Sequence, residues 1–195
     1  MADAPARFNK DTTCCFTGHR KRDLPFGGDT STPGMKVLVS TLMLEIEDAV
    51  RAGYKTFLTG MAEGVDLICA ELVHDLITKG RDIELVCVLP YRKHIREIKN
   101  DRDAYVYDML TELYPSIVLA DHYDSDCYRR RNKFMVDNCS RVIGVLKMKP
   151  GGSGTYQTVS MARKQGLELR ILRLDSNPLY YLENDDDKRR HSDDG

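Results

Sequence analysis

The sequence has no long apolar run, no C-x-x-C cysteine pair and no excess of positive charge. No segment approaches the roughly 18 consecutive apolar residues that a membrane-spanning helix needs. Its 29 Lys and Arg residues and 30 Asp and Glu residues give a formal net charge of −1, which disfavours the broad basic field of a nucleic-acid-binding domain. Residues 1–11 lack the apolar core of a secretory signal, so we expect a cytoplasmic protein that does not engage a membrane.

The cysteines show no C-x-x-C motif, and no group of Cys and His residues has the short spacing of a zinc site. Four of them fall within apolar runs, where a reduced thiol acts as a small hydrophobic side chain. We therefore predict no metal site. We also predict buried, reduced thiols at Cys14, Cys15, Cys69, Cys87, Cys127 and Cys139.

Two common nucleotide-binding motifs are missing as well. No G-x-G-x-x-G follows the first apolar run, and no G-x-x-x-x-G-K-[ST] occurs in the chain. Nicotinamide-dependent dehydrogenases and P-loop hydrolases need these loops to hold phosphates. The sequence therefore supports neither class.

What the chain does contain is an alternation of short apolar runs and amphipathic stretches. The run IELVCVL at 83–89 is almost wholly aliphatic, as expected of a parallel strand covered on both faces. Within 35–52, Leu38, Leu42 and Ile46 share one face of a helix. This alternation predicts an α/β fold: a Rossmann-like three-layer sandwich with a mostly parallel, twisted sheet. We expect strands at 13–16, 54–59, 83–89, 116–120, 141–146 and 168–174, and helical segments at 35–52, 65–79, 92–113, 128–139 and 155–165.

The 195 residues suit one domain with polar segments at both ends. We expect residues 1–11 to form a flexible lead, 12–176 the Rossmann-like domain and 177–195 a polar tail. The stretch ENDDDKRRHSDDG at 183–195 has no apolar anchor. Because it cannot bury enough surface to offset the entropy of ordering, we predict that this tail is disordered.

Three glycine-bearing turns follow predicted strands, at 17–20, 60–66 and 150–155. Ligands of open parallel sheets bind outside the carboxyl ends of the strands, so we expect these turns to converge on one site. The helix that follows the strand at 116–120 contributes an arginine and an asparagine. The predicted ligand contacts are Gly18, His19, Arg20, Gly60, Gly64, Asp66, Arg131, Asn132, Gly151, Gly152, Ser153, Gly154 and Thr155.

The last of these turns has the chemistry of an anion-binding loop. Its glycines let backbone N–H groups approach an anion, and the helix that begins there adds unpaired N–H donors. The helix dipole contributes only about 0.3–1 kcal/mol, so we expect Arg20 and Arg131 to supply much of the affinity through charge-assisted hydrogen bonds. Of the run Arg129–Arg131 we expect one arginine in the site. Tyr91 is a candidate for stacking on a base.

Several motifs together resemble the YpsA-like proteins, a bacterial family of the SLOG superfamily that also contains the DNA-processing protein DprA and the Lonely Guy phosphoribohydrolases. The resemblance covers about residues 12–175. It implies a Rossmann-like sheet, a nucleotide-type ligand site and a link to cell division or envelope stress. The motifs are TGHR (17–20), TGMAEGVDLICAEL (59–72), LPY (89–91), RNKFMVDNCSRVIGV (131–145) and GGSGT (151–155).

The resemblance implies roles for individual residues, and the chain departs from it in one place. Lonely Guy enzymes carry P-G-G-x-G-T-x-x-E, whose glutamate assists cleavage of the N-glycosidic bond. Here Thr158 stands at the glutamate position, and threonine cannot act as a carboxylate base. The matching residues are Gly60, Gly64 and Asp66 of the second-strand glycine motif, Arg131 and Asn132 of the arginine-bearing helix, and Gly151, Gly152, Gly154 and Thr155 of the late phosphate loop.

Three functions follow as hypotheses. The first is a binding or sensor protein for a nucleotide or an NAD- or ADP-ribose-derived ligand. The second is a nucleoside-monophosphate N-glycoside hydrolase in which Glu63 or Asp66 replaces the missing glutamate. The third, single-stranded DNA binding as in DprA, rests on Arg129–Arg131 and Lys133 and is disfavoured by the net charge and the few aromatic residues. The sequence leaves the ligand, the protein partners and a homo-oligomeric state open.

Overall fold

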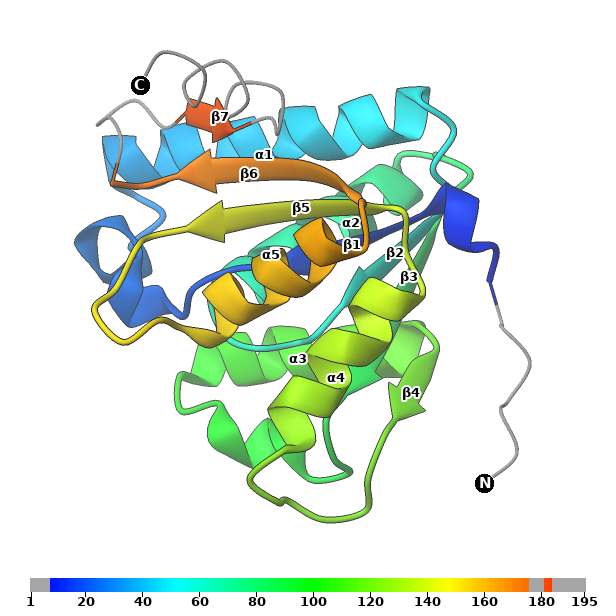
Figure 1. Ribbon diagram of the computed structural model, residues 1–195, viewed down its shortest axis with the longest axis vertical. Coiled ribbons are helices and arrows are strands. Elements are labelled where there is room, and N and C mark those ends of the chain that lie inside the picture. Colours follow the sequence, from blue (N-terminus) through cyan, green and yellow to red (C-terminus); the bar gives the residue numbers. More distant parts are fainter. Residues whose placement is uncertain (1–7, 176–180, 184–195) are drawn as a thin grey trace.

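The computed structural model describes residues 8–175 and 181–183, and in them the strands form one seven-stranded sheet in the order β4-β3-β2-β1-β5-β6-β7 (Figure 1). Neighbouring strands from β4 to β6 pair in parallel, and β7 pairs antiparallel with β6. The mostly parallel α/β sheet expected from the sequence is confirmed. The strands are β1 (Thr13–Thr17), β2 (Thr56–Thr59), β3 (Glu84–Leu89), β4 (Ser116–Val118), β5 (Arg141–Leu146), β6 (Glu168–Arg173) and β7 (Tyr181–Glu183).

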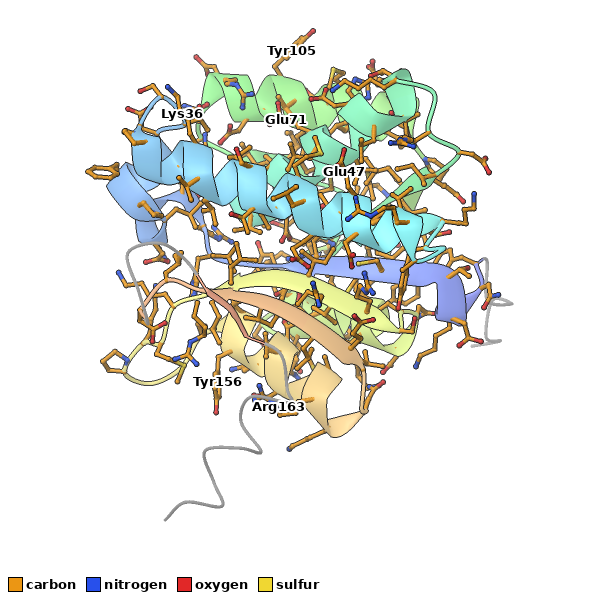
Figure 2. All side chains as sticks on the ribbon, turned by 90° about the horizontal axis from the view of Figure 1, so that it is seen from above. Lys36, Glu47, Glu71, Tyr105, Tyr156 and Arg163 are labelled. Carbon is orange, nitrogen blue, oxygen red and sulfur yellow. The ribbon has the colours of Figure 1, made fainter. Side chains whose placement is uncertain are left out.

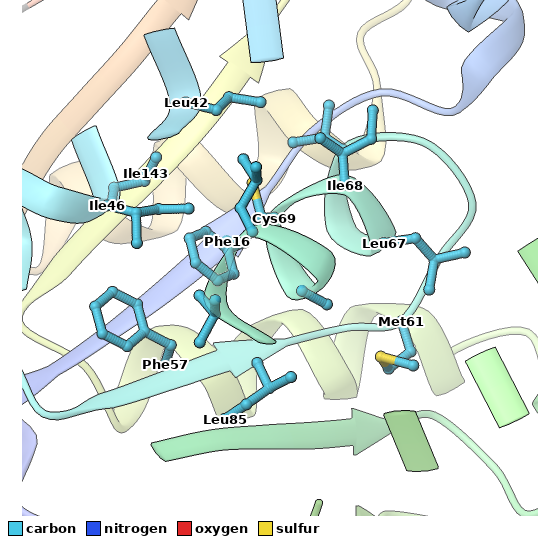
Figure 3. Packing of buried hydrophobic residues seen from close by; sticks show 14 of the residues in the cluster. Phe16, Leu42, Ile46, Phe57, Met61, Leu67, Ile68, Cys69, Leu85 and Ile143 are labelled. Carbon is cyan, nitrogen blue, oxygen red and sulfur yellow. The ribbon is translucent and has the colours of Figure 1, made fainter. Parts of the chain in front are cut away.

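Helices cover both faces of this sheet and complete the three layers (Figure 1). Side chains alternate between the faces: Phe16 joins the core under α1, α2 and α3, whereas its neighbour Cys15 joins the core under α4 and α5. In the first core, Phe16 stacks on Phe57 with 5.9 Å between ring centroids (Figure 3). The helices are α1 (Pro33–Arg51), α2 (Val65–Thr78), α3 (Asp101–Leu113), α4 (Cys127–Asp137) and α5 (Gly154–Lys164).

The apolar periodicity of the sequence explains these elements. Leu38, Leu42 and Ile46, the expected inner face of α1, are all fully buried. Strand β5 is buried along its whole length, which matches its nearly continuous apolar sequence. Helix α1 ends at Arg51, and Gly53 just beyond its C-cap has a φ of 95°, which favours glycine at this position.

The order of the strands creates a crevice at the carboxyl edge of the sheet. The chain runs outward from β1 to β4 and then crosses back to place β5 on the other side of β1. The loops that follow β1 and β5 consequently leave the sheet in opposite directions. Such a topological switch point is where open α/β sheets bind ligands.

Local details differ from the sequence prediction in three segments. The helical region expected at 92–113 is split into the short helix η4 (His94–Glu97) and α3, because Asn100 caps α3 by accepting a hydrogen bond from the Asp103 N–H at 3.1 Å. Short helices η1 (Lys10–Thr12), η2 (Lys21–Asp23) and η3 (Pro25–Gly28) were not expected. Residues 1–7 of the predicted lead and residues 177–180 and 184–195 of the predicted tail lie outside the described residues, as does residue 176 at the end of the predicted domain.

All of the cysteines are buried free thiols, as the sequence predicted. Burial raises the pKa of the Cys14 and Cys69 thiols well above the ordinary value, which keeps them protonated and unreactive. Among the described residues, no helix has the length and apolar character needed to cross a bilayer.

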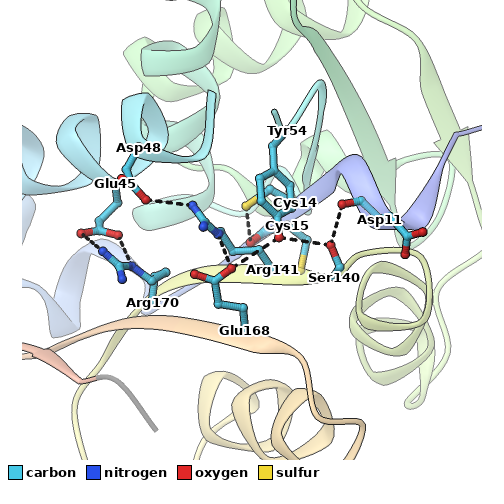
Figure 4. Close-up of polar contacts among 10 residues, drawn as sticks. All are labelled: Asp11, Cys14, Cys15, Glu45, Asp48, Tyr54, Ser140, Arg141, Glu168 and Arg170. Atoms are coloured by element: carbon cyan, nitrogen blue, oxygen red, sulfur yellow. Dashed lines mark hydrogen bonds and ion pairs between the residues drawn. The ribbon is translucent and has the colours of Figure 1, made fainter. Parts of the chain in front are cut away.

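At the opposite, amino-terminal end of the sheet, a network of ion pairs ties α1 to β5 and β6 (Figure 4). Arg141 bonds Asp48 at 3.1 Å and Glu168 at 2.8 Å, and Arg170 bonds Glu45 at 2.7 Å. The Arg141 guanidinium also lies 4.6 Å from the centroid of the Tyr54 ring. These charges satisfy one another, which indicates a structural role for this end of the sheet.

Candidate functional site

A cavity of about 350 Å³ lies at the switch point, where the β1 loop faces the amino-terminal ends of α4 and α5. Its position beyond the carboxyl ends of β1 and β5 is the one that the fold predicts for a ligand. Three predicted contacts, Gly60, Gly64 and Gly151, do not line it. The predicted contacts that do line it are Gly18, His19, Arg20, Asp66, Arg131, Asn132, Gly152, Ser153, Gly154 and Thr155.

His19 joins the two loops that diverge at the switch point. The Lys147 N–H, just after β5, donates a hydrogen bond to His19 Nε2 at 2.9 Å. Burial, reinforced by nearby Lys149, lowers the pKa of His19 below its ordinary value, so the ring is neutral and its Nε2 can accept this bond. His19 thus holds the cavity walls together.

The amino-terminal end of α5 presents unpaired donors to the cavity. Ser153 caps the helix by accepting a hydrogen bond from the Tyr156 N–H at 3.1 Å. The N–H groups of Gly154 and Thr155 have no acceptor among the described residues. Gly152 has a φ of 80°, which favours glycine. Gly154 does not have a positive φ, and a Cβ added to it would meet no atom within 4 Å. Protein packing alone therefore gives no reason for a glycine at 154.

Arg131 and Asp66 form an ion pair in the wall of the cavity. Nη1 of Arg131 lies 2.9 Å from Oδ2 of Asp66, and the two side chains are 6% and 7% exposed. Burial raises the pKa of Asp66, and the Arg131 charge opposes this rise. Nε of Arg131 is buried and has no hydrogen-bond partner in the described part of the chain. A ligand oxygen is the natural acceptor for such a group.

The glycines of the first two turns serve close packing. A Cβ on Gly60 would lie 1.2 Å from Nη1 of Arg131, so only glycine leaves room for the buried guanidinium. A Cβ on Gly64, whose φ is 92°, would lie 2.4 Å from the His19 carbonyl oxygen. A Cβ on Gly18 would lie 2.3 Å from Cβ of Val65. These glycines position the cavity wall, and among them only Gly18 also lines the cavity.

Further cations surround the cavity. Arg20 is half-buried and forms no ion pair with a described residue. Arg22 is exposed and pairs with Asp23 at 3.8 Å, a long contact that contributes little. Lys149 pairs with Asp23 at 2.6 Å and lowers the pKa of that carboxyl.

Of the arginine run on α4, only Arg131 lines the cavity. Arg129 pairs with Asp126 at 2.9 Å and Arg130 pairs with Asp124, and all four side chains are exposed. These outward ion pairs do not add to the charge of the cavity.

The candidate catalytic residues are placed differently from one another. Asp66 lines the cavity but is held by Arg131, and Glu63 does not line it. Thr158, at the position of the Lonely Guy glutamate, is fully buried and donates a hydrogen bond from Oγ1 to the Gly154 carbonyl at 2.9 Å. It therefore stabilises the first turn of α5.

Sequence reasoning missed several residues of the cavity. Tyr91, the expected stacking residue, is buried outside it, whereas Tyr128 at the start of α4 lines it. Tyr128 directly precedes the arginine run, and Lys149 directly precedes the glycine loop, so proximity to the motifs was the available signal. Arg22 and Asp23 lie just after the TGHR motif at 17–20, so the same signal was available for them.

A second hollow of about 550 Å³ lies between α1, α2 and α3 and is separated from the first by the loop that follows β1. It is lined by Gly64 and by the ion pair of Lys21 with Asp103 at 2.6 Å. Although larger, it lies away from the switch point, and its Arg102 is already paired with Glu71 at 2.7 Å. We therefore place the candidate site in the smaller cavity.

Comparisons with known proteins agree with the fold. The sequence model of YpsA, described as the YspA SLOG family, matches residues 14–177. UPF0398 proteins of Bacillus thuringiensis (strain Al Hakam) and Bacillus cereus (strain B4264) are each 23% identical over 143 residues, covering 69% of this chain and 73% of the relative. DNA processing protein A (DprA) from Streptococcus pneumoniae has a similar structure, with a TM-score of 0.55 and 15% identity over 83% of this chain. This chain spans 50% of DprA, and that likeness shows the fold alone.

Proposed function

The chain belongs to the YspA SLOG family, and from this premise we propose that its switch-point cavity binds a nucleotide or a nucleotide derivative such as an ADP-ribose-like molecule. Family membership and the DprA-like fold support a nucleotide-related function in general. The specific proposal is a binding or sensor protein that takes the phosphate of this ligand at the amino-terminal end of α5.

The observation that carries the proposal is the surplus of anion-binding groups around the cavity. The N–H groups of Gly154 and Thr155, Nε of Arg131 and the Arg20 guanidinium all lack a protein acceptor among the described residues. Helix ends and arginines of this kind bind phosphate oxygens through charge-assisted hydrogen bonds. The unobstructed space at Gly154 leaves room for the phosphate to reach the backbone.

Thermal unfolding in the presence of AMP, ADP, NAD⁺ and ADP-ribose tests the proposal. A ligand at about 100 times its dissociation constant stabilises the folded state by about 2.7 kcal/mol, which raises the Tm of a domain of this size by roughly 5–10 °C. We expect at least one of these ligands to do so. A flat response to all four would contradict the proposal.

Two variants locate the site. Gly154→Ala adds a methyl group where no protein atom lies within 4 Å, so the free protein keeps its fold or gains about 0.4–1 kcal/mol, while affinity for the ligand falls about tenfold or more. Arg20→Ala should weaken binding about tenfold. The matched control is Arg129→Ala, an arginine of α4 that points away from the cavity. An equal loss in all three variants would mean that the effect is not local to the site.

A hydrolase is the second candidate, because Asp66 is a buried carboxyl group that lines the cavity. Its raised pKa is a common property of acid–base residues. Incubation with nucleoside monophosphates, with chromatography of the released base, decides between binding and hydrolysis. Base release that Asp66→Asn abolishes and Glu63→Gln leaves intact would establish the enzyme; no release by the wild type would leave the binding function.

A further inference from the structure

Tyr128 is an aromatic wall of the switch-point cavity, and its neighbours hold its ring in place. The side chain is half-buried at the first turn of α4. Tyr91, His94 and Tyr123 surround it with ring centroids 6.4, 5.9 and 6.4 Å away and interplanar angles between 62° and 76°. Such inclined contacts between aromatic rings are favourable and fix the ring that they surround.

This aromatic cluster carries no charge at neutral pH. His94 is 1% exposed, and burial together with the charges of Arg131 and Arg20 lowers its pKa to about 3. Its ring is therefore uncharged, like the tyrosines around it. The cluster forms a fixed, uncharged support behind Tyr128.

Two guanidinium groups lie over the Tyr128 ring, and only one of them is held by an ion pair. The guanidinium carbon of Arg20 lies 5.9 Å from the ring centroid and that of Arg131 lies 6.0 Å from it. Arg131 is tied to Asp66, whereas Arg20 has no ion pair with a described residue. Arg20 can therefore move aside for a planar group, or cover it once it is bound. Nucleic-acid bases stack on tyrosine rings and on arginine planes in this way.

We propose that Tyr128 stacks on the base of the bound nucleotide, with Arg20 as a movable cover. This inference rests on the proposed function, because the phosphate is placed at Gly154 and Thr155, which line the same cavity as Tyr128. At about 350 Å³ the cavity is small enough for one compact ligand to touch Tyr128 and this helix end together. The ligand class is a phosphate ester that carries a planar aromatic base, and sugar phosphates without a base bind poorly.

Calorimetric titration with adenosine 5′-monophosphate and with ribose 5-phosphate tests the inference. We expect the wild type to bind the adenosine ligand at least tenfold more tightly. Tyr128→Leu should lose about 5- to 150-fold in affinity for it, the range that one base stack contributes, and should keep its affinity for ribose 5-phosphate. Tyr128→Phe retains the ring and should bind like the wild type. The matched control is Tyr156→Leu on α5, whose side chain is 41% exposed and points away from the sheet (Figure 2).

A spectroscopic readout separates stacking from a structural effect. The chain has no tryptophan, so its intrinsic fluorescence comes from tyrosine. Stacking of adenine on Tyr128 should quench part of this emission, and Tyr128→Leu should remove the quenching. Equal affinity of the wild type for both ligands, or equal losses for both in Tyr128→Leu, would overturn the base-stacking role while leaving a phosphate site. If the wild type binds neither ligand and none of the four nucleotides raises its Tm, the proposed function fails as well.

Discussion

Gly60→Ala probes the buried pair of Arg131 with Asp66 from a residue that is neither charged nor part of the cavity surface. The added Cβ would lie 1.2 Å from Nη1 of Arg131 and 2.6 Å from Oδ2 of Asp66. One of the two charges has to move. Separating a buried ion pair costs about 3–5 kcal/mol, a large share of the 5–15 kcal/mol that typically stabilises a domain. The corresponding fall in Tm is about 10 °C.

Urea denaturation of Gly60→Ala measures this cost, and two comparisons isolate its cause. Gly154→Ala, where the methyl group meets open space, should not destabilise the protein. In the background of Asp66→Asn with Arg131→Met, which removes both charges, Gly60→Ala should cost about 1 kcal/mol or less, because no ion pair remains to be broken. A Gly60→Ala protein within about 0.5 kcal/mol of the wild type would refute the reasoning.

The pH dependence of the same variant has a definite sign. Burial already raises the pKa of Asp66 in the wild type, and loss of Arg131 as a partner raises it further. A carboxyl group with a raised pKa destabilises the folded state when it is ionised and not when it is protonated. The stability difference between Gly60→Ala and the wild type should therefore narrow as the pH falls through the raised pKa of Asp66. A difference that widens in acid would contradict this assignment.

Two further outcomes follow from residues outside the cavity surface. The pKa of His94 lies at about 3, against 6.5 for an exposed histidine, so the buried neutral ring costs stability as the pH falls between these values. His94→Phe should remove about 2 kcal/mol of this acid destabilisation at pH 5, measured by urea denaturation at pH 5 and pH 7. An unchanged difference in stability between the two pH values would contradict this prediction. Phe26 has a φ of 51° and is 74% exposed. Phe26→Asn should stabilise the protein by about 0.5–1 kcal/mol, because asparagine tolerates this left-handed conformation better than phenylalanine. A lower Tm of the variant would contradict this and show that the exposed ring makes a favourable contact.

Much of the fold followed from periodicity in the sequence. The aliphatic run at 83–89 predicted a strand, and the apolar spacing within 35–52 predicted a helix. The corresponding elements, β3 and α1, lie within two residues of their predicted bounds. The family match confirms the expected family, which could be recognised from sequence because its motifs are contiguous. The break between η4 and α3 was missed, because the cap at Asn100 is a single local contact inside a charged region.

The site was less accessible to sequence reasoning. Gly60 was expected to approach a ligand, but its neighbour in space is Arg131, and no sequence pattern reports that residues 60 and 131 touch. The same applies to Tyr128, which reaches the cavity because α4 starts there, while Tyr91 is covered by the other rings. The positions of Gly60 and Tyr128 depend on contacts between segments that are distant in the sequence, whereas the glycine loop before α5 can be recognised from its local sequence.

The most direct test of the account is to follow the backbone amide signals of the protein by nuclear magnetic resonance during titration with adenosine 5′-monophosphate. Phosphate bound at the amino-terminal end of α5 should shift the Gly154 and Thr155 amide signals first and most strongly, with saturation at the calorimetric dissociation constant. Signals of the second hollow, such as those of Lys36 and Glu71, should stay in place. Shifts confined to that hollow would contradict the claim that the switch-point cavity binds a nucleotide.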